Sequence, residues 1–259
     1  MLFLYDNTFE GFLSVVFECY SRKIEPVNIS PETNHQEILF IRKEKIVTDR
    51  IHADRVWKGL QKKLTPETRQ MPYSAFLSGE NGIEMALYRF IRMTFASPVP
   101  VTGNYGDPDV LMVRKAARRV MQEAMRMLQF VRFQRTRDDI YFAPISPAYD
   151  VLPMILQQFK SRFADQVWLI YDLRRDYGFF YDRQTIEEVT LTEKSFNTFN
   201  GTLSSGLLQE DEAMYMRMWN DYCQSITIRE RLNLKLQKQH MPKRYWKFLP
   251  EKGINKGKK

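Results

Sequence analysis

Three aspartates stand where carboxylates often do chemistry. Asp6, Asp172 and Asp182 each follow an apolar run that closes on tyrosine: Leu-Phe-Leu-Tyr-Asp, Trp-Leu-Ile-Tyr-Asp and Gly-Phe-Phe-Tyr-Asp. A carboxylate at the end of a strand can act as a general base or hold a metal ion. An aspartate at the same place also closes turns, because its side chain accepts backbone N–H bonds. The turn role is the more ordinary one, so the three aspartates are only candidate catalytic residues.

Other catalytic signatures are absent from the sequence. The chain contains neither of the glycine-rich phosphate-binding patterns, G-x-G-x-x-G and G-x-x-x-x-G-K-[ST], and it has no G-x-S-x-G nucleophile turn. His35, His52 and His240 share no metal-ligand spacing with one another or with a cysteine, and no C-x-x-C occurs. We therefore expect no metal site and no cofactor. The sequence leaves open whether the protein is an enzyme.

The predicted strands and helices that carry these residues do not alternate strictly along the chain. This order favours an α+β fold over a doubly wound sheet. We expect a mixed sheet with several packed helices and a helix-rich middle and C-terminal part. A single α+β domain is predicted over residues 1–250, followed by a basic flexible tail at 251–259. Strands are predicted at 2–5, 37–42, 46–47, 130–134, 140–143, 167–171, 179–181 and 188–191. Helices are predicted near 9–20, 50–63, 66–78, 81–96, 108–129, 149–163, 210–224 and 229–239.

The predicted helix after Pro108 carries the clearest charge pattern. Asp107, Pro108 and Asp109 supply an N-cap, a first-turn proline and an acid that the helix dipole favours. On a wheel of about 100° per residue, apolar side chains fill an arc of about 100° and basic ones an opposing arc of about 140°. One face is therefore predicted to pack into the core and the other to present guanidinium groups, which pair with phosphate in a bidentate way. The apolar arc contains Val110, Val113, Ala117, Val120, Ala124, Met127 and Leu128, and the basic arc contains Arg114, Lys115, Arg118, Arg119 and Arg126.

Positive charge is concentrated in two stretches. Residues 110–137 carry +7 and residues 229–247 carry +6, while the whole chain carries +8, so the remainder is net acidic. Such clustering is the footprint of an anion-binding face. The second stretch also interleaves aromatic rings, which can stack on unpaired bases while Lys and Arg follow phosphates. The predicted nucleic-acid-binding residues are Arg114, Arg118, Arg119, Arg126, Arg132, Lys243, Arg244, Tyr245 and Trp246.

Simpler interpretations of these patterns stay open. A basic helix face can be merely solvated, or paired with the acidic remainder of the chain. Tyr245, Trp246 and Phe248 can dock a terminal helix onto the core, a role that is compatible with base stacking.

Composition bounds the class of protein. With 259 residues, 44% of them hydrophobic, the chain can bury a core. No apolar run approaches the roughly 20 residues of a membrane helix, and the first residues do not resemble a secretory signal. Cys19 and Cys223 require no disulfide framework. We therefore expect a soluble, cytoplasmic protein without a membrane partner.

Five separated motifs occur in order along nearly the whole chain. They are Leu4-Tyr5-Asp6 with Phe9-Glu10-Gly11-Phe12, Arg126-Met127-Leu128-Gln129-Phe130-Val131-Arg132-Phe133, Tyr141-Phe142-Ala143-Pro144-Ile145, Arg162-Phe163-Ala164-Asp165-Gln166 with Trp168, and Met241-Pro242-Lys243-Arg244-Tyr245-Trp246 with Leu249-Pro250. Together they resemble a bacterial family, domain of unknown function 4130, described as proteins of DNA metabolism or repair. Members of that family occur beside a radical S-adenosylmethionine protein or fused ahead of a uracil-DNA-glycosylase-like domain. This chain resembles the stand-alone form, without the glycosylase part.

The resemblance implies DNA metabolism, and the charge clusters favour phosphate contacts. The leading hypothesis is a nucleic-acid-associated accessory factor that presents DNA or RNA, DNA being favoured, to a radical S-adenosylmethionine partner protein. A second hypothesis is a metal-independent, glycosylase-like enzyme that acts on a damaged or modified base through Asp and Tyr side chains. A third is a protein-interaction module whose basic faces meet acidic protein surfaces and no nucleic acid.

Overall fold

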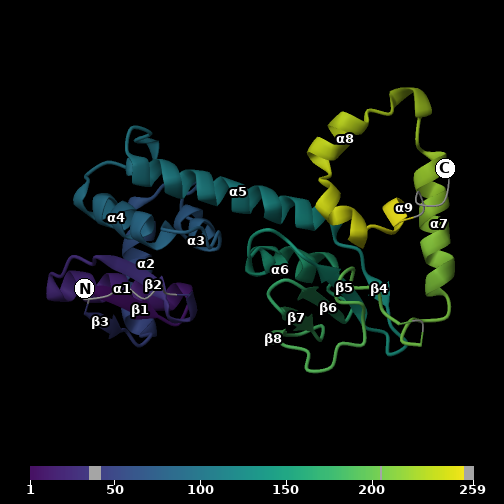
Figure 1. Cartoon of the computed structure of the whole chain (residues 1–259), viewed down its shortest axis with the longest axis horizontal. Helices are drawn as coiled ribbons and strands as arrows, with labels where there is room; N and C mark the ends of the chain where they lie inside the picture. Colours follow the sequence, from purple (N-terminus) through teal and green to yellow (C-terminus); the bar gives the residue numbers. More distant parts are fainter. Residues whose placement is uncertain (35–41, 205, 254–259) are drawn as a thin grey trace. The chain divides into compact units, whose positions relative to one another are not determined.

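The computed structural model describes residues 1–34, 42–204 and 206–253. The chain divides into two compact units, Met1–Met121 and Gln122–Lys259, called unit 1 and unit 2 below (Figure 1). Each unit holds a sheet with helices, so the predicted α+β class is confirmed. The predicted single domain stays a prediction. Helix α9 (Pro250–Gly253) occupies the start of the predicted tail, whose residues 254–259 lie outside the described residues.

Unit 1 is built on a three-stranded parallel sheet in the order β2-β1-β3. All four residues of the central strand are buried, which explains why its sequence is continuously apolar rather than alternating. The predicted strand at 37–42 lies, apart from residue 42, outside the described residues, and β3 ends directly before the predicted run at 46–47. The elements are β1 (Leu2–Tyr5), β2 (Asn28–Pro31), β3 (Lys43–Lys45), α1 (Phe9–Arg22), α2 (Arg50–Lys63), α3 (Met71–Phe76) and α4 (Ile83–Ala96).

The helix predicted over residues 66–78 is shorter in the structure. Residues 66–70 form a turn, and only α3 is helical. The N–H of Thr68 donates to the carbonyl of Thr65 (2.9 Å), and the N–H of Met71 donates to the carbonyl of Thr68 (3.0 Å). Three-residue spacing of this kind closes single turns and does not propagate an α-helix. The first-turn proline of the helix is Pro72, and not Pro66 as the sequence suggested.

Helix α5 (Pro108–Phe130) is the longest in the described part of the chain and begins as predicted. The side chain of Asp107 caps it by accepting the N–H groups of Asp109 (2.9 Å) and Val110 (3.0 Å). Its helical bonding continues as far as the N–H of Val131, so the strand predicted at 130–134 is wrong. Six of the seven residues of the predicted apolar arc are buried: Val110, Val113, Ala117, Val120, Ala124 and Met127.

Unit 2 is built on a five-stranded sheet that is mixed, as predicted, and its strand order is β4-β5-β6-β7-β8. Strands β5 and β6 are parallel and are joined by α6, whereas the other neighbouring strands pair antiparallel. Trp168 of β6 contacts Phe159 of α6, with ring centroids 6.4 Å apart. The elements are β4 (Gln134–Arg135), β5 (Tyr141–Ile145), α6 (Leu152–Arg162), β6 (Trp168–Asp172), β7 (Tyr177–Tyr181), β8 (Ile186–Val189), α7 (Glu212–Ser225) and α8 (Leu234–His240).

The C-terminal part of unit 2 is helical but more broken than predicted. The helix expected over 229–239 begins only at Leu234, where the side chain of Asn233 accepts the N–H of Leu236 (2.9 Å) and caps α8. Residues Arg229–Arg231 form a single 3₁₀ turn instead. A second 3₁₀ segment, Lys243–Phe248, carries the basic and aromatic residues that the sequence singled out.

Candidate functional site

All three candidate aspartates close turns at strand ends. In each turn the carboxylate accepts the N–H of the residue two positions further on, which is the geometry of an Asx turn. The turn role expected from the sequence is therefore present at each, while a catalytic role stays a prediction. The donor–acceptor pairs are Thr8 to Asp6 (3.0 Å), Arg174 to Asp172 (2.9 Å) and Gln184 to Asp182 (2.7 Å).

Asp6 also ties the end of β1 to the segment that follows β3. Its Oδ2 accepts the hydroxyl of Thr48 at 2.6 Å, and its Oδ1 accepts the hydroxyl of Thr8 at 2.6 Å. Burial raises the pKa of Asp6, but the hydrogen bonds from Thr48 and Thr8 together lower it below the usual value. Gly11 makes room for this arrangement, because a Cβ there would lie 2.1 Å from Asp6 Oδ1. A carboxylate that accepts this many hydrogen bonds is a weak base. Asp6 therefore serves to hold the end of β1 against the segment that follows β3.

An open pocket of about 610 Å³ lies beside Asp6 in unit 1. It is at the carboxyl edge of the parallel sheet, the edge where α/β proteins commonly bind ligands. Its lining contains three carboxylates and only one arginine, so its charge does not suit a phosphate. The lining residues are Asp6, Thr8, Glu10, Thr48, Arg50, Ile51 and Asp54.

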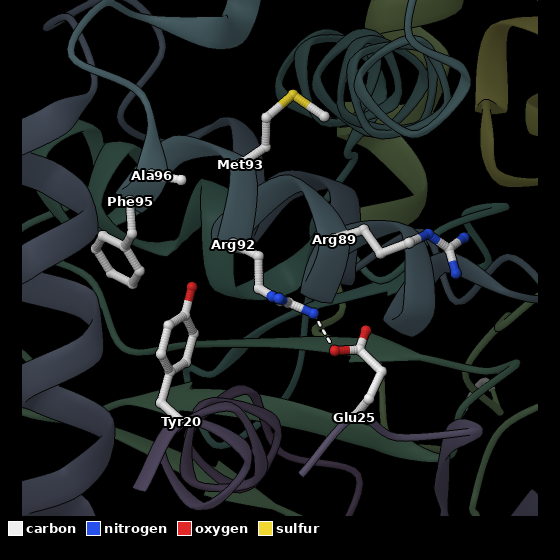
Figure 2. Close-up of a pocket in the computed structure, with 7 residues that line it drawn as sticks. All are labelled: Tyr20, Glu25, Arg89, Arg92, Met93, Phe95 and Ala96. Carbon is white, nitrogen blue, oxygen red and sulfur yellow. Dashed lines mark hydrogen bonds and ion pairs between the residues drawn. The ribbon is translucent and has the colours of Figure 1, made fainter. Parts of the chain in front are cut away.

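A second pocket of unit 1, of about 550 Å³, contains two arginines (Figure 2). Arg92 forms an ion pair with Glu25 across this pocket, and Arg89 forms a bidentate pair with Asp109 (2.6 and 2.7 Å). Both guanidinium groups are thus neutralised within the unit. The pocket therefore offers no uncompensated charge to an anionic ligand.

In unit 2, Asp172 anchors the loop that follows β5. Its carboxylate is completely buried and accepts Arg175 Nη1 at 2.7 Å. Arg175 in turn donates to the carbonyl of Ala148 (3.2 Å). The carboxyl ends of the parallel strands β5 and β6 are joined in this way, at the kind of edge that α/β sheets use for ligands.

The same edge holds a pair that the sequence did not single out. The hydroxyl of Tyr177 donates to Asp150 at 2.5 Å. Burial raises the pKa of both groups, and in Tyr177 the negative charge of Asp150 adds to the rise. A carboxyl group with a raised pKa is the kind that general acid–base catalysis employs. No local pattern marks Asp150, because its partner is 27 residues away.

The carboxylate of Glu123 contacts three of the predicted nucleic-acid-binding residues, Arg126, Arg244 and Tyr245. Its side chain is 1% exposed, and its Oε2 accepts both Arg244 Nη2 and the hydroxyl of Tyr245 at 2.5 Å. Arg126 Nη1 lies 3.8 Å from the same oxygen, and Oε1 accepts the N–H of Ala148 at 2.8 Å. Burial and the Glu123 charge raise the pKa of Tyr245. The only acid of the first basic stretch is therefore the residue that binds the second stretch to it.

Arg132 is engaged in a comparable way by Glu251. Its Nη2 lies 2.8 Å from Glu251 Oε1, and its guanidinium lies over the ring of Trp219, 5.5 Å from the centroid. The indole N–H of Trp219 donates to the other oxygen of Glu251 at 3.0 Å. Arg132 thus already has an internal carboxylate where the sequence suggested a phosphate.

The aromatic residues of the last motif pack within unit 2. Tyr245 is 2% exposed, and its ring contacts Phe130 of α5. Trp246 is half-buried and donates its indole N–H to the carbonyl of Met241 at 2.9 Å. The packing role that the sequence left open is observed for both residues. Lys243 is exposed, and its contact with nucleic acid stays a prediction.

The basic face of α5 within unit 1 is organised differently. Arg114, Lys115, Arg118 and Arg119 are all exposed. Arg114 lies over the ring of Tyr105, 4.8 Å from the centroid, and Arg119 lies 3.2 Å from Glu80. Among the residues that the structure describes, the side chains of Lys115 and Arg118 have no ion pair or hydrogen bond. We call these four residues the α5 basic face. Lys115 belongs to it, although the predicted list of binding residues did not include it.

Within residues 1–34, 42–204 and 206–253, no group of three or more His, Cys, Asp or Glu side chains could hold a metal ion. None of the helices in those ranges combines the length and the apolar character needed to cross a membrane.

The fold and these sites define an α+β protein in which two buried carboxylates of unit 2, Glu123 and Asp172, hold Arg126, Arg175 and Arg244. The model of the DUF4130 family, a domain of unknown function, matches residues 81–251, about two thirds of the chain. The chain therefore belongs to this family, and four of the five sequence motifs lie within the matched range. No match was found among curated proteins or among solved structures.

Proposed function

We propose that the protein binds nucleic acid through the α5 basic face. The observation that carries this proposal is that Lys115 and Arg118 are exposed and have no intramolecular partner in the described part of the chain. Of the two flanking arginines, Arg114 contacts only neutral groups, the Tyr105 ring and the carbonyl of Thr102, whereas Arg119 pairs with Glu80. Arg119 is the least available of the four, because the Glu80 oxygen that it faces at 3.2 Å is buried.

The predicted binding arginines of unit 2, Arg126, Arg132 and Arg244, are less suited to this role, because each lies beside a carboxylate of the same unit. Arg244 would have to leave Glu123, whose buried carboxylate would then lose a cationic partner. Breaking a fully buried pair typically costs about 3–5 kcal/mol, and because Arg244 is 45% exposed the lower end, about 3 kcal/mol, applies here. The α5 basic face is therefore the first candidate for contact with nucleic acid. Lys243 is the second, because it is exposed.

The biological setting belongs to the same proposal. The protein acts in bacterial DNA metabolism or repair as an accessory factor that presents nucleic acid, DNA in preference to RNA, to a radical S-adenosylmethionine partner enzyme. The support for this part is the resemblance of the five motifs to that family, together with the positive charge of α5. The partner supplies the chemistry, and this chain supplies the electrostatic attraction.

The test is fluorescence anisotropy with labelled single-stranded DNA, duplex DNA and RNA across a salt series. Binding should weaken linearly in log salt, with a slope of about −0.7 to −0.9 for each neutralised phosphate. The double variant Lys115→Gln/Arg118→Gln should flatten this slope by about 1 to 2. A matched control is Lys58→Gln/Lys62→Gln, which removes the same charge from exposed positions of α2 in the same unit.

Equal slopes for wild type and the α5 double variant would refute the assignment to α5. If no nucleic acid binds at about 50 mM salt, nucleic-acid binding itself is wrong, and the third hypothesis, a protein-interaction module, takes its place.

A second candidate function rests on the Asp150–Tyr177 pair. A half-buried carboxyl group with a raised pKa, beside the carboxyl ends of β5 and β6, could serve a glycosylase-like enzyme as a proton donor. Asp150→Asn and Asp172→Asn should then abolish base release from a lesion-bearing oligonucleotide while leaving its binding unchanged. A Tm measured for each variant separates loss of chemistry from loss of fold, and unchanged turnover in both would leave only the structural roles.

A further inference from the structure

The apolar face of helix α7 is exposed, although the apolar face of a helix normally packs into a core. On a wheel of about 100° per residue, its large apolar side chains fill one arc of about 140°. These residues are Met214, Tyr215, Met218, Trp219 and Tyr222, and between 39% and 58% of each is exposed. The buried residues of α7 are Glu212 and Asn220. A helix of a single soluble chain normally shows the opposite arrangement, so this apolar arc, apart from Trp219, which contacts Arg132 and Glu251, is matched to something other than the core of unit 2.

The exposed apolar surface continues along the chain beyond α7. Ile226, Ile228, Leu232, Leu234 and Leu236 are all about half exposed or more. The three leucines line a groove of about 330 Å³ together with Arg231, Asn233, Gln237 and His240. We call the apolar residues of α7 and of this following segment the α7–α8 surface. Ten large exposed apolar residues within 23 positions exceed what scattered exposure explains.

The charge around the groove indicates what covers it. Arg231, Lys235 and Lys238 are exposed and form no ion pair within the part of the chain that the structure describes. Leucines that alternate with unpaired cations match a helix with an apolar stripe and carboxylates at its borders, the usual helix-in-groove arrangement. A second copy of this chain would bring the same cations against each other across a two-fold axis. Nucleic acid would satisfy the cations but leave Leu and Ile side chains without a stacking partner.

We infer that the α7–α8 surface is a docking site for a partner protein that presents an acidic amphipathic helix. This interaction is separate from nucleic-acid binding by α5, and the two surfaces can be tested independently. The apolar residues supply most of the affinity, and Arg231, Lys235 and Lys238 fix the orientation and accelerate association.

The test uses the full chain and two labelled helical peptides of designed sequence. Both carry leucines at i, i+3, i+4 and i+7, and one has glutamates and the other lysines beside the apolar stripe. Wild-type protein should bind the glutamate peptide saturably and the lysine peptide at least about tenfold more weakly. Leu234→Ser/Leu236→Ser should weaken binding of the glutamate peptide by about tenfold or more. Both leucines are exposed, so these substitutions leave the fold intact.

Reversing the charge of the lysines beside the groove is a stronger test than removing the leucines, because the two peptides should respond in opposite directions. Lys235→Glu/Lys238→Glu should weaken binding of the glutamate peptide and strengthen binding of the lysine peptide. Lys58→Glu/Lys62→Glu on α2 makes the same charge change elsewhere and should do neither. The inference is overturned if the protein binds the two peptides equally or neither of them saturably. It is also overturned if light scattering shows a dimer that the leucine variants dissociate, because the occupant is then a second copy. The α5 double variant described above should bind the glutamate peptide as wild type does.

Discussion

Removing the Glu123 carboxylate should loosen the C-terminal segment of unit 2 more than any other single truncation on α5. Glu123→Ala leaves the buried hydroxyl of Tyr245 and the N–H of Ala148 without an acceptor and deprives Arg244 of its carboxylate. Breaking a buried pair from one side costs about 3–5 kcal/mol. Arg244 is 45% exposed, so water takes over part of its hydrogen bonding, and the lower end, about 3 kcal/mol, is expected. Glu123→Gln keeps the shape and one acceptor, so it should cost about 1–2 kcal/mol.

Urea unfolding followed by tryptophan fluorescence measures this loss, because Trp168, Trp219 and Trp246 all lie in unit 2. Hydrogen exchange provides a local measurement, since the N–H groups of Tyr245 and Leu249 should exchange faster in Glu123→Ala. Arg126→Gln is the control. Its guanidinium lies 3.8 Å from Glu123 and is partly exposed, so the expected loss is about 0.5 kcal/mol. If Glu123→Ala were as stable as this control, the argument that Glu123 holds the C-terminal segment would be refuted.

Three further outcomes are expected. Gly11→Ala should destabilise unit 1 by about 1–2 kcal/mol in urea titrations, because the new Cβ displaces Asp6 from Thr48; stability at or above wild type would contradict the predicted clash. The pKa of Asp6 is lower in the folded than in the unfolded chain. Ionised Asp6 therefore contributes its full stabilisation at pH values above the unfolded pKa of about 3.9. This stabilisation is lost as the pH falls through the folded pKa. The difference in unfolding free energy between wild type and Asp6→Asn should therefore shrink in acid, and a constant difference from pH 7 to pH 2 would count against it. Burial raises the pKa of Cys19 to about 12, so mass spectrometry after alkylation of the folded protein should find Cys223 modified well before Cys19, and equal rates would contradict the assigned burial.

The sequence predicted best those features that depend on neighbouring residues. The apolar arc of α5 and its cap at Asp107 are local patterns, and both are observed. The Asx turns at the three aspartates are local as well, because the donor lies two residues from each acceptor. The strand predicted at 130–134 was wrong over residues 130–133, and β4 begins only at Gln134, because Phe130, Val131 and Phe133 make a short, largely apolar segment around Arg132. In so short a segment, the spacing of the apolar residues fits a strand and the last turn of a buried helix equally well.

The features that the sequence could not predict depend on distant partners. Arg244 looks like a phosphate ligand until Glu123, 121 residues earlier, is found beside it. Asp150 carries no local sign that it meets Tyr177. Helix α7 shows a recognisable apolar arc, but a periodic pattern does not say whether that arc faces the core of the same chain or a partner. Only the exposed fractions of its side chains distinguish the two.

The long-range ties of unit 2 have a consequence for how the chain is made. Glu123 and Arg132 receive their partners from residues that are synthesised 119–122 positions later. At about 5–20 residues per second, the second half of α5 waits on the order of ten seconds for these partners to leave the ribosome. During that time Glu123 lacks Arg244 and Tyr245, whereas the buried core cluster of unit 1 in the described part of the chain runs from Phe3 to Ala117 and can already pack. Unit 1 should therefore fold before unit 2, which must wait until residues 244–251 have been synthesised, so any chaperone that assists this protein would act on the nascent second unit.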